Sequence, residues 1–403
     1  MSTLTPLRRA AHLSILLAFA LITREARGQQ CGGTEPEIVP GGKAVAGRVL
    51  VKFKPHLSDA AIAALNASLG SRISGSFRHA PDLKLVSLPR GMSVTEGVRW
   101  FAHRPEVVRA EPDAIFEIDV VPIDARFGDQ WGLHNVGQDN GLADFDVDAP
   151  EAWDLISASP TVVIGSIDTG VQLNHMDLSS VWTNPGEQPG NGIDDDGNGY
   201  VDDLNGYDFF NHDGGPWDDN AHGTHVMGIA AASGNNGIGV AGVTWNAKVM
   251  ALKVCNACGQ CPCSAIVPAV DYATDMGARV TNNSYGGTFQ CAGLDEAIGR
   301  AEAAGVLFVA AAGNSSSDND QTHVFPAGFD HDNIIAVAAT ARDGTLAAFS
   351  NYGATTVDLG APGQAIWSTI PDKTFGIMSG TSMAAPFVTG AIALLMAYNP
   401  HLS

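Results

Sequence analysis

The sequence lacks positive charge where it is most acidic. Its 403 residues include 22 Lys or Arg against 43 Asp or Glu, which gives a formal net charge of −21. Between residues 127 and 247 there are 19 acidic residues and no Lys or Arg. A chain of this charge repels polyanions, which argues against nucleic acids and anionic membrane surfaces as partners. Local salt bridges therefore cannot offset the repulsion among these carboxylates, and another source of positive charge is needed.

We expect no segment that is long and apolar enough to cross a membrane. Arg8 and Arg9 precede the thirteen-residue apolar run "AAHLSILLAFALI", and small residues follow at Ala26 and Gly28. A bilayer span takes roughly 20 residues, so this run is too short to cross a membrane. The charged start and small-residue end predict a cleaved signal peptide over residues 1–28, with the twin-arginine route left open by the paired arginines. We expect a secreted, extracellular protein with no membrane partner.

Cysteine is scarce, and its six copies are unevenly placed. Four lie in "CNACGQCPC" (residues 255–263), Cys291 follows, and Cys31 lies near the signal cleavage point. The C-x2-C-x2-C spacing is compatible with zinc, but a distant second pair is missing and export favours disulfides. With Cys31 lost in processing, we expect at most two disulfides and one free thiol in the mature chain.

Basic residues are concentrated near the N-terminus, and this marks a domain boundary. The first 120 residues hold 15 of the 22 Lys and Arg, whereas the remainder holds seven against 32 acidic residues. Within residues 47–119, strand-like and helix-like segments follow the order β-α-β-β-α-β, with Ser58 and Ser93 as helix caps and Gly70 as a helix stop. This pattern predicts a small α+β domain that ends near residue 120.

The remainder of the chain has the pattern of an α/β domain. Near-continuous apolar segments, typical of strands buried on both faces, alternate with segments of helical composition that end at Gly. This alternation predicts a mostly parallel sheet with helices on both faces, and in such sheets function gathers at the carboxyl ends of the strands. The expected strands are residues 161–168, 247–254, 277–284, 305–314 and 333–339, and the expected helices are residues 222–234, 264–277, 294–305 and 380–398.

Three residues at the predicted ends of these elements have the chemistry of a nucleophilic site. Asp168 ends a strand, His222 opens a helix, and Ser382 opens another helix. Each alone has an ordinary structural interpretation, such as a helix cap for Ser382. Together they match a Ser nucleophile that needs an adjacent base and a third group to orient that base. Their order along the chain, Asp, His, Ser, is the order found in subtilisin.

The local sequences extend this match. "VIGSIDTGVQLNHMDL", "HGTHVMGI", "AAAGN" and "SGTSMAAPFVTG" resemble the four signature blocks of the subtilisin-like serine peptidases, over residues 127–403. The resemblance implies a secreted serine endopeptidase that works through an acyl-enzyme intermediate. It implies that Asp168 orients His222, that His222 is general base and then acid, and that Ser382 attacks the peptide carbonyl. Asn314 of "AAAGN" would donate to the oxyanion.

The same resemblance implies how substrate binds and how the enzyme is made. Residues 31–120 resemble the family's pro-segment, an intramolecular inhibitor that the enzyme later cuts off between Ile118 and Arg126. The cysteine-rich loop falls where the family lines the pocket for the fourth residue upstream of the cut, which it would narrow. Peptide substrates would add as a strand along the edge segment "NNSYGG" (residues 282–287), with a medium apolar side chain before the cut. The implied cleft residues are Ser284, Tyr285, Gly286, Ala311, Gly313 and Val324.

The acidic stretch "NGIDDDGNGYVDD" (residues 191–203) predicts a calcium loop. It has the D-x-D-x-N-G start of such loops, although the EF-hand pattern fails at its twelfth position, Asn205. The alternative is a solvated acidic loop. The family resemblance implies a second structural Ca²⁺ site. Expected ligands of the first site are Asp194, Asp196, Asn198, the carbonyl of Tyr200, and Asp202 or Asp203; those of the second are Gln130, Asp177, Asn236 and the carbonyls of Gly234, Ile238 and Val240.

Two other classes of protein were weighed against the peptidase. An esterase of the α/β-hydrolase type needs Ser within G-x-S-x-G and the order Ser, Asp, His, and both requirements fail here. A calcium-binding interaction protein on a degenerate peptidase scaffold is opposed by the intact set Asp168, His222, Asn314 and Ser382. The sequence ends 21 residues after Ser382, where family members usually continue through a further helix, so it is either a fragment or a shortened member.

Overall fold

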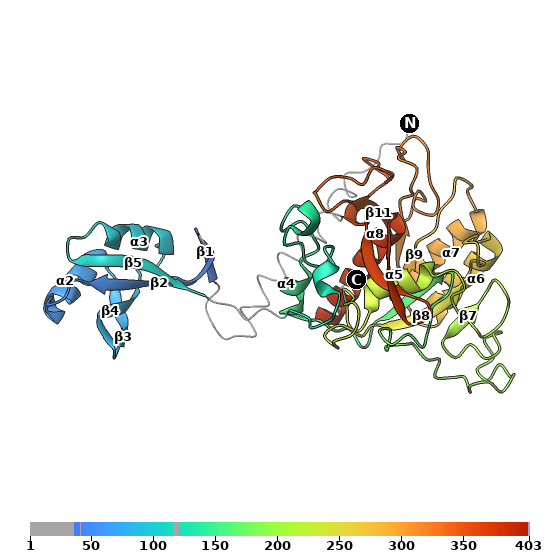
Figure 1. Ribbon diagram of the computed structural model, residues 1–403, viewed down its shortest axis with the longest axis horizontal. Coiled ribbons are helices and arrows are strands. Elements are labelled where there is room, and N and C mark those ends of the chain that lie inside the picture. The colour runs from blue at the N-terminus through green and yellow to red at the C-terminus, as the bar shows by residue number, and fades with distance from the viewer. Residues whose placement is uncertain (1–35, 41, 116–120, 402–403) are drawn as a thin grey trace. The chain divides into compact units, whose positions relative to one another are not determined.

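The computed structural model describes residues 36–40, 42–115 and 121–401. The predicted signal peptide, Cys31 and Ile118 lie outside the described residues. The chain divides between residues 119 and 120 into two compact units, which are described separately (Figure 1).

The N-terminal unit is an antiparallel sheet with two helices. Its strands are β1 (Pro36–Val39), β2 (Gly42–Phe53), β3 (Arg72–Phe77), β4 (Ala80–Ser87) and β5 (Val107–Ala114), and its helices are α2 (Asp59–Leu69) and α3 (Val94–Ala102). β2 pairs with β1, β4 and β5, and β4 pairs with β3. Alternate residues of β2 form a core with apolar residues of both helices. Relative to the predicted order, β1 is an additional strand.

The helix ends of this unit follow from local sequence. The Ser58 side chain accepts a hydrogen bond from the backbone of α2, and Gly70 ends that helix in the left-handed conformation, with φ of 77°. Ser93 opens α3 with a reciprocal capping box to Glu96. All three predicted helix boundaries are confirmed.

The larger unit contains a seven-stranded sheet in the order β12-β11-β10-β9-β6-β8-β7, in which every pairing is parallel. The predicted α/β fold class is confirmed, and the five predicted strands are present. The strands are β6 (Val163–Asp168), β7 (Gly206–Asp208), β8 (Lys248–Lys253), β9 (Val280–Asn283), β10 (Leu307–Ala311), β11 (Ile334–Thr340) and β12 (Leu359–Pro362).

Helices cover both faces of this sheet. α6 (Cys263–Asp275) and α7 (Ala292–Ala303) share an apolar core with inward residues of the strands. On the other face lies α8 (Thr381–Tyr398), whose Thr389 hydroxyl donates to the Asn282 side chain of β9 at 2.9 Å. α5 (His222–Ala231) packs beside α8. Contrary to the expectation from sequence, one described helix outside the N-terminus, α8, has the length and composition of a membrane span. It is instead largely buried as the central helix of this unit.

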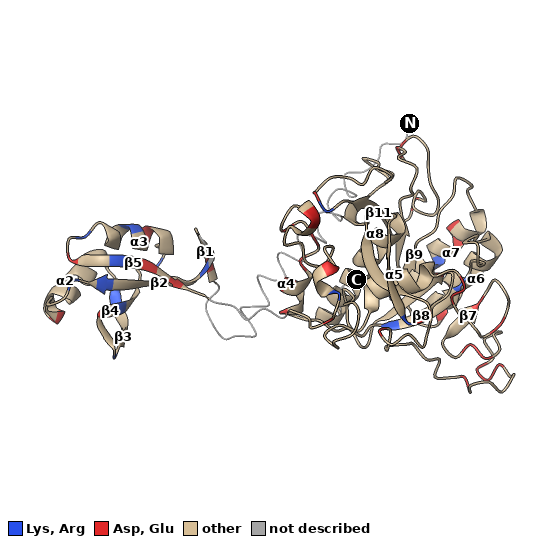
Figure 2. Ribbon diagram, viewed as in Figure 1, with Lys and Arg blue, Asp and Glu red and all other residues tan. Residues whose placement is uncertain are grey.

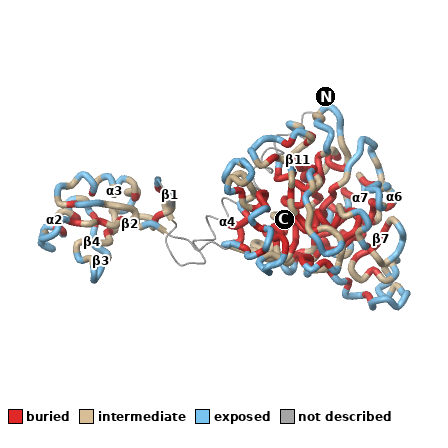
Figure 3. Tube along the Cα trace, in the orientation of Figure 1, coloured by how far each residue is buried: buried red, intermediate tan, exposed pale blue. Residues whose placement is uncertain are grey.

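Smaller elements complete the unit. A short helix α4 (Ala149–Trp153), the 3₁₀ turns η1 (Phe127–Asp129) and η2 (Gln138–Asn140), and a hairpin of β13 (Ile366–Ile370) and β14 (Thr374–Met378) were not predicted. The hairpin packs on α5, where the Thr369 hydroxyl donates to the Thr224 carbonyl at 2.8 Å. Figure 2 shows acidic residues along the loops that precede and follow β7, and Figure 3 shows buried residues concentrated in the interior of the unit.

Candidate active site

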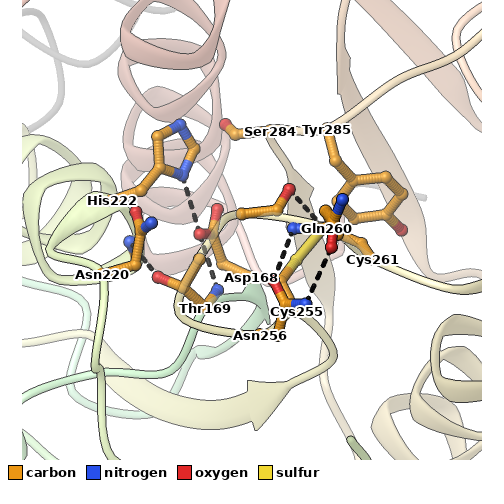
Figure 4. Close-up of a disulfide and its surroundings, with 12 residues drawn as sticks. Asp168, Thr169, Asn220, His222, Cys255, Asn256, Gln260, Cys261, Ser284 and Tyr285 are labelled. Atoms are coloured by element: carbon orange, nitrogen blue, oxygen red, sulfur yellow. Dashed lines mark hydrogen bonds and ion pairs between the residues drawn. A yellow bond between two sulfur atoms is a disulfide. The ribbon is translucent and has the colours of Figure 1, made fainter.

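The carboxyl end of β6 brings Asp168 to the first residue of α5. Asp168 is buried, at 2% exposure, and its Oδ1 lies 2.7 Å from Nδ1 of His222 (Figure 4). The backbone N–H of Thr169 donates to the same oxygen at 2.7 Å, whereas Oδ2 has no hydrogen-bond partner among the described residues. Burial opposes protonation of His222, but the charge and hydrogen bond of Asp168, together with the charge of Asp218, outweigh it and raise the pKa of His222.

Asp218 fixes the start of α5 relative to β6. Its Oδ2 accepts from the backbone N–H and the hydroxyl of Thr224 at 2.9 and 2.6 Å, and its Oδ1 accepts from the Thr169 hydroxyl at 2.8 Å. It therefore caps the helix that begins at His222 while it holds the segment after Asp168. Sequence reasoning missed Asp218. Its position four residues before a predicted helix start was the available signal.

Gly223 allows the two segments to approach. A Cβ atom at this position would lie 2.1 Å from the carbonyl oxygen of Gly170 and 3.2 Å from Asp168. Only glycine fits this contact, so the G of "HGTH" is required by packing.

The start of α8 places Ser382 beside Ser284 and beside Asn314. The Ser382 hydroxyl donates to the Ser284 carbonyl at 3.0 Å, and the Ser284 hydroxyl donates to the Ser382 carbonyl at 2.9 Å. Among the described residues, no hydrogen bond joins Ser382 to His222. Oδ1 of Asn314 accepts from the backbone N–H and hydroxyl of Thr381, at 2.8 and 3.0 Å. This fixes the orientation of the amide, so its Nδ2 is directed away from Thr381 as a donor.

A cleft of about 680 Å³ leads from Asp168 and His222 along the edge segment. Of the predicted substrate residues, Ser284, Tyr285 and Gly286 line it, whereas Ala311, Gly313 and Val324 do not. Val324 packs between Gly286 and Gly313. A Cβ atom added at Gly286 would lie 3.0 Å from its Cγ1, and one added at Gly313 would lie 3.5 Å from it. The lining also includes the cysteine-rich loop and four apolar side chains, Ile266, Leu294, Phe325 and Phe329.

Two disulfides lie in the wall of this cleft. Cys255 pairs with Cys261 within the loop, and Cys263 at the start of α6 pairs with Cys291, which precedes α7. Cys258 is an exposed free thiol on the same loop. The prediction of two bridges and one thiol is confirmed, and since four of these cysteines are oxidised, the zinc interpretation is not supported. Figure 4 shows the Cys255–Cys261 bond beside Tyr285 and near Asp168.

The acidic stretch forms one cluster of carboxylates. One oxygen from each of Glu187, Asp194 and Asp196 lies within 4.8 Å of the others. Glu187 is buried, and its Oε2 has no hydrogen-bond partner. It was missed by sequence reasoning because it lies outside the motif. A buried carboxylate that has one oxygen without a donor among the described residues, and that lies close to two further carboxylates, fits a hard cation such as Ca²⁺.

Of the other predicted residues of this stretch, Asn198 bonds the cluster directly, since its backbone N–H donates to Asp194 at 3.1 Å. Asn198 donates to Asp196 and Asp203 at 3.1 and 2.8 Å, and buried Asp203 also accepts from the Tyr272 hydroxyl at 2.6 Å. Asp202 accepts instead from the backbone of residues 191 and 192, away from the cluster. The Tyr200 ring stacks edge-on with Tyr272 in an aromatic cluster.

The second predicted calcium site is built around Asp177. Asp177 is fully buried and accepts from Nδ2 of Asn236 at 2.7 Å and from the Val240 backbone at 2.9 Å. Gln130, a predicted ligand of this site, instead bonds the Ala241 backbone with its whole amide. Its Nε2 donates to the Ala241 carbonyl and its Oε1 accepts from the Ala241 N–H, both at 2.8 Å. Asp124, which sequence reasoning missed, is buried against this loop and accepts from the backbone of Asn236 and of its neighbour at position 235. Gly234 and Ile238 lie in the same loop.

Burial leaves these two carboxylates short of stabilisation. It raises the pKa of Asp177 to about 6, with a further contribution from the negative charge of Asp124, and it also raises the pKa of Asp124. Two adjacent buried carboxylates of raised pKa favour a bound cation, which would hold both in their charged forms.

Comparison with known proteins gives consistent matches for both units. Residues 159–403 match the profile of the subtilase family, and residues 35–113 match that of the fervidolysin N-terminal prodomain. The chain is 35% identical to a thermophilic serine proteinase of Bacillus sp. (strain AK1), over 88% of this chain and 79% of that one. It is 39% identical to thermitase of Thermoactinomyces vulgaris, over 62% and 79% respectively. Solved structures agree. A protease of Pseudoalteromonas arctica matches with a TM-score of 0.57 and 29% identity, over 70% of this chain and 89% of that one, and a cold adapted subtilisin-like serine proteinase with 0.52 and 31%, over 68% and 86%.

Proposed function

This chain belongs to the subtilase family of serine proteases, and on that basis we propose that it is a secreted endopeptidase whose reaction is carried by Asp168, His222, Ser382 and Asn314. The observation that carries the proposal is the 2.7 Å contact between Asp168 and His222 at the wall of a cleft that Ser284 also lines, with Ser382 bonded to that same Ser284.

The reaction begins with proton transfer from Ser382 to His222. In the resting arrangement the Ser382 hydroxyl bonds the Ser284 carbonyl, so rotation about its Cα–Cβ bond is needed to bring it to Nε2 of His222. The deprotonated oxygen attacks the peptide carbonyl, and the imidazolium is stabilised by Asp168. His222 then protonates the leaving amine, and water hydrolyses the acyl-enzyme by the same steps.

Negative charge on the tetrahedral intermediate is held by two donors. The backbone N–H of Ser382 at the start of α8 is one, and Nδ2 of Asn314 is the other. Thr381 supports the second donor, because it occupies the Oδ1 side of the Asn314 amide.

The cleft supports an extended peptide as substrate. A strand laid along Ser284–Gly286 would gain backbone hydrogen bonds, and its upstream side chains would meet the apolar side chains and disulfides of the cleft wall. Val324 packs behind Gly286 of the cleft wall, and from there it would limit the residue before the cut to a medium apolar side chain. The prodomain match supports an intramolecular inhibitor that is removed by self-cleavage, and homologous proteases support export of the mature enzyme.

Two structural Ca²⁺ sites complete the proposal. Glu187, Asp194 and Asp196 would hold the first ion, and Asp177, Asp124 and Asn236 would contribute to the second. The ions would supply the positive charge that residues 127–247 lack, and would stiffen two loops against self-digestion.

The test is the Ser382→Ala variant of the full precursor, assayed on casein and on a peptide amide. We expect activity below about a thousandth of wild type with an unchanged circular dichroism spectrum. A serine-directed phosphonate should abolish wild-type activity and label no residue in the variant. Retained activity would identify another nucleophile.

A further inference from the structure

Lys253, the last residue of β8, is a buried cation that the proposed reaction does not use. Its exposure is 1%, and its ammonium group donates three hydrogen bonds. The acceptors are the Thr169 carbonyl at 2.8 Å, Oδ1 of Asp219 at 2.6 Å and the Cys255 carbonyl at 2.9 Å. All three protons of the ammonium group are therefore used, which is the condition under which a buried lysine is stable in its charged form.

The three acceptors belong to three segments that form the site. Thr169 follows Asp168, and Asp219 lies three residues before His222. Cys255 opens the loop that forms one wall of the cleft. The strand register reinforces this arrangement, because Lys253 pairs with Asp168 across the β6–β8 ladder. The backbone N–H groups of the two residues after Lys253, Val254 and Cys255, also donate to the Asp168 carbonyl, at 2.8 and 3.3 Å.

The charge of Lys253 is placed where this chain has little other positive charge. Asp219 bonds the ammonium group of Lys253 directly. Asp168 and Asp218 each accept a hydrogen bond from Thr169, whose carbonyl accepts from Lys253. Oδ2 of Asp168 has no hydrogen-bond donor among the described residues. Since residues 127–247 contain no Lys or Arg, the compensating cation comes from β8, at residue 253.

We propose that Lys253 is a positioning residue for catalysis: its ammonium group locks the segments after Asp168 and before His222 onto the cleft wall, and its charge counters that of Asp219, the neighbour of Asp218 in the chain. This inference rests on the proposed roles of Asp168 and His222. A lysine that only stabilised the fold, with its charge far from the reacting groups, would affect stability but neither kcat nor the ionisation of His222.

The direction in which each variant shifts the pKa of His222 separates a positioning role for Lys253 from a purely structural one. Catalytic efficiency requires neutral His222, so kcat/KM rises with pH through the pKa of His222 in the free enzyme. The positive charge of Lys253 disfavours the imidazolium, and the negative charge of Asp219 favours it. The other charged or titratable groups near His222 are Asp168, Asp218, His225 on α5 and Tyr285 on the opposite wall, and these stay constant.

The experiment compares three variants of the full precursor after maturation: Lys253→Met, Asp219→Asn and the control Asp271→Asn. Asp271 is on α6, where it pairs with Arg300 rather than Lys253. We expect the acid limb of kcat/KM to move by about 0.3 to 0.5 pH unit, upward for Lys253→Met and downward for Asp219→Asn, as one partly screened charge would give. The control should move by less than about 0.1 unit, since exposed charges are screened. Lys253→Met should also lower kcat about 10- to 100-fold with KM within about twofold, because misplacement acts on the transition state.

The outcomes are distinguishable. Shifts of the same sign in both variants, or no shift in either, would overturn the positioning role, since a purely structural residue gives no opposed pair. Asp219 is about half exposed, at 47% of its side chain, so its partner can be removed without leaving a buried unpaired carboxylate. If Lys253→Met nevertheless fails to mature, an unmoved acid limb in Asp219→Asn alone refutes the proposal. Failure of a phosphonate to label wild-type Ser382 would instead refute the proposed function.

Discussion

In the proposed calcium loop, the effect of Glu187→Gln on the melting temperature should change sign when Ca²⁺ is added. In the absence of Ca²⁺, Glu187, Asp194 and Asp196 repel one another. At the observed separation of at most 4.8 Å, a pair of like charges costs about 1 kcal/mol in an environment close to water. Glu187→Gln removes two of these repulsions, so in excess chelator its melting temperature should equal or exceed that of wild type.

With Ca²⁺ the order should reverse. Ca²⁺ that binds only the folded state adds about 2.7 kcal/mol at 100 times Kd. For a unit of this size 1 kcal/mol moves the melting temperature by about 2 to 4 °C, so wild type should gain about 5 to 10 °C from the ion at this one site. Glu187→Gln should lose most of the gain at this site, because a buried charged ligand has become neutral, and should keep the part due to Asp177.

The assay is thermal unfolding of the Ser382→Ala precursor, which removes self-digestion, in chelator, in Ca²⁺ and in equimolar Mg²⁺. Asp195→Asn is the matched control, since it changes the same charge in the same loop but bonds Gln188 and Asn191 outside the cluster. An identical loss of the calcium response in Asp195→Asn would show that the effect is general charge rather than coordination. An unchanged melting curve in chelator would refute both sites.

Three further outcomes are expected. The Ser382→Ala precursor should stay full length when purified alone, and its normal processing would show that another protease makes the cut. His331 is bonded at Nε2 by Asp295 and at Nδ1 by Glu302, both at 2.9 Å, and although burial lowers the pKa of His331, these carboxylates raise it above 6.5. Its contribution to stability is therefore complete below pH 6.5 and is lost as pH rises through the folded pKa, so His331→Gln should lower the melting temperature at pH 6 more than at pH 9, and equal losses would contradict this. Reduction of the mature enzyme with a dithiol should lower kcat/KM for a peptide with a large upstream side chain more than for a short amide, since both bridges line the cleft. Mass spectrometry should find one free thiol before reduction.

The sequence predicted best what depends on neighbouring residues. Ser58, Gly70 and Ser93 act within one helical turn, so their roles in helix capping could be read locally. The buried strands were found because a strand covered on both faces is apolar throughout. Helix α5 ends at Ala231, earlier than predicted, because the next residue is extended and its carbonyl accepts from the Gly242 backbone. That partner lies ten residues on and leaves no local signal.

What the sequence missed depends on contacts between distant segments. Glu187 joins Asp196 across a loop and lies outside any motif. Asp124 bonds residues more than a hundred positions away, so nothing near it in the chain marks it as a ligand. Gln130 was assigned by family resemblance, but the Ala241 backbone occupies both ends of its amide. The hairpin of β13 and β14 was missed because its strands are short and only partly buried.

The closed loop between Cys255 and Cys261 has a consequence for redesign. Its first residue shares the Asp168 carbonyl with the backbone of Val254, and its two ends are joined by a disulfide with a sequence separation of six. The residues between these ends are largely exposed, and several face the cleft. We therefore expect that residues 257–260 can be varied to change which peptides are accepted. Lys253, Cys255 and Cys261 would have to be retained, and so would Asn256, whose side chain accepts from the backbone of residues 258 and 260. A library confined to residues 257–260 would explore new specificities without disturbing the reacting groups.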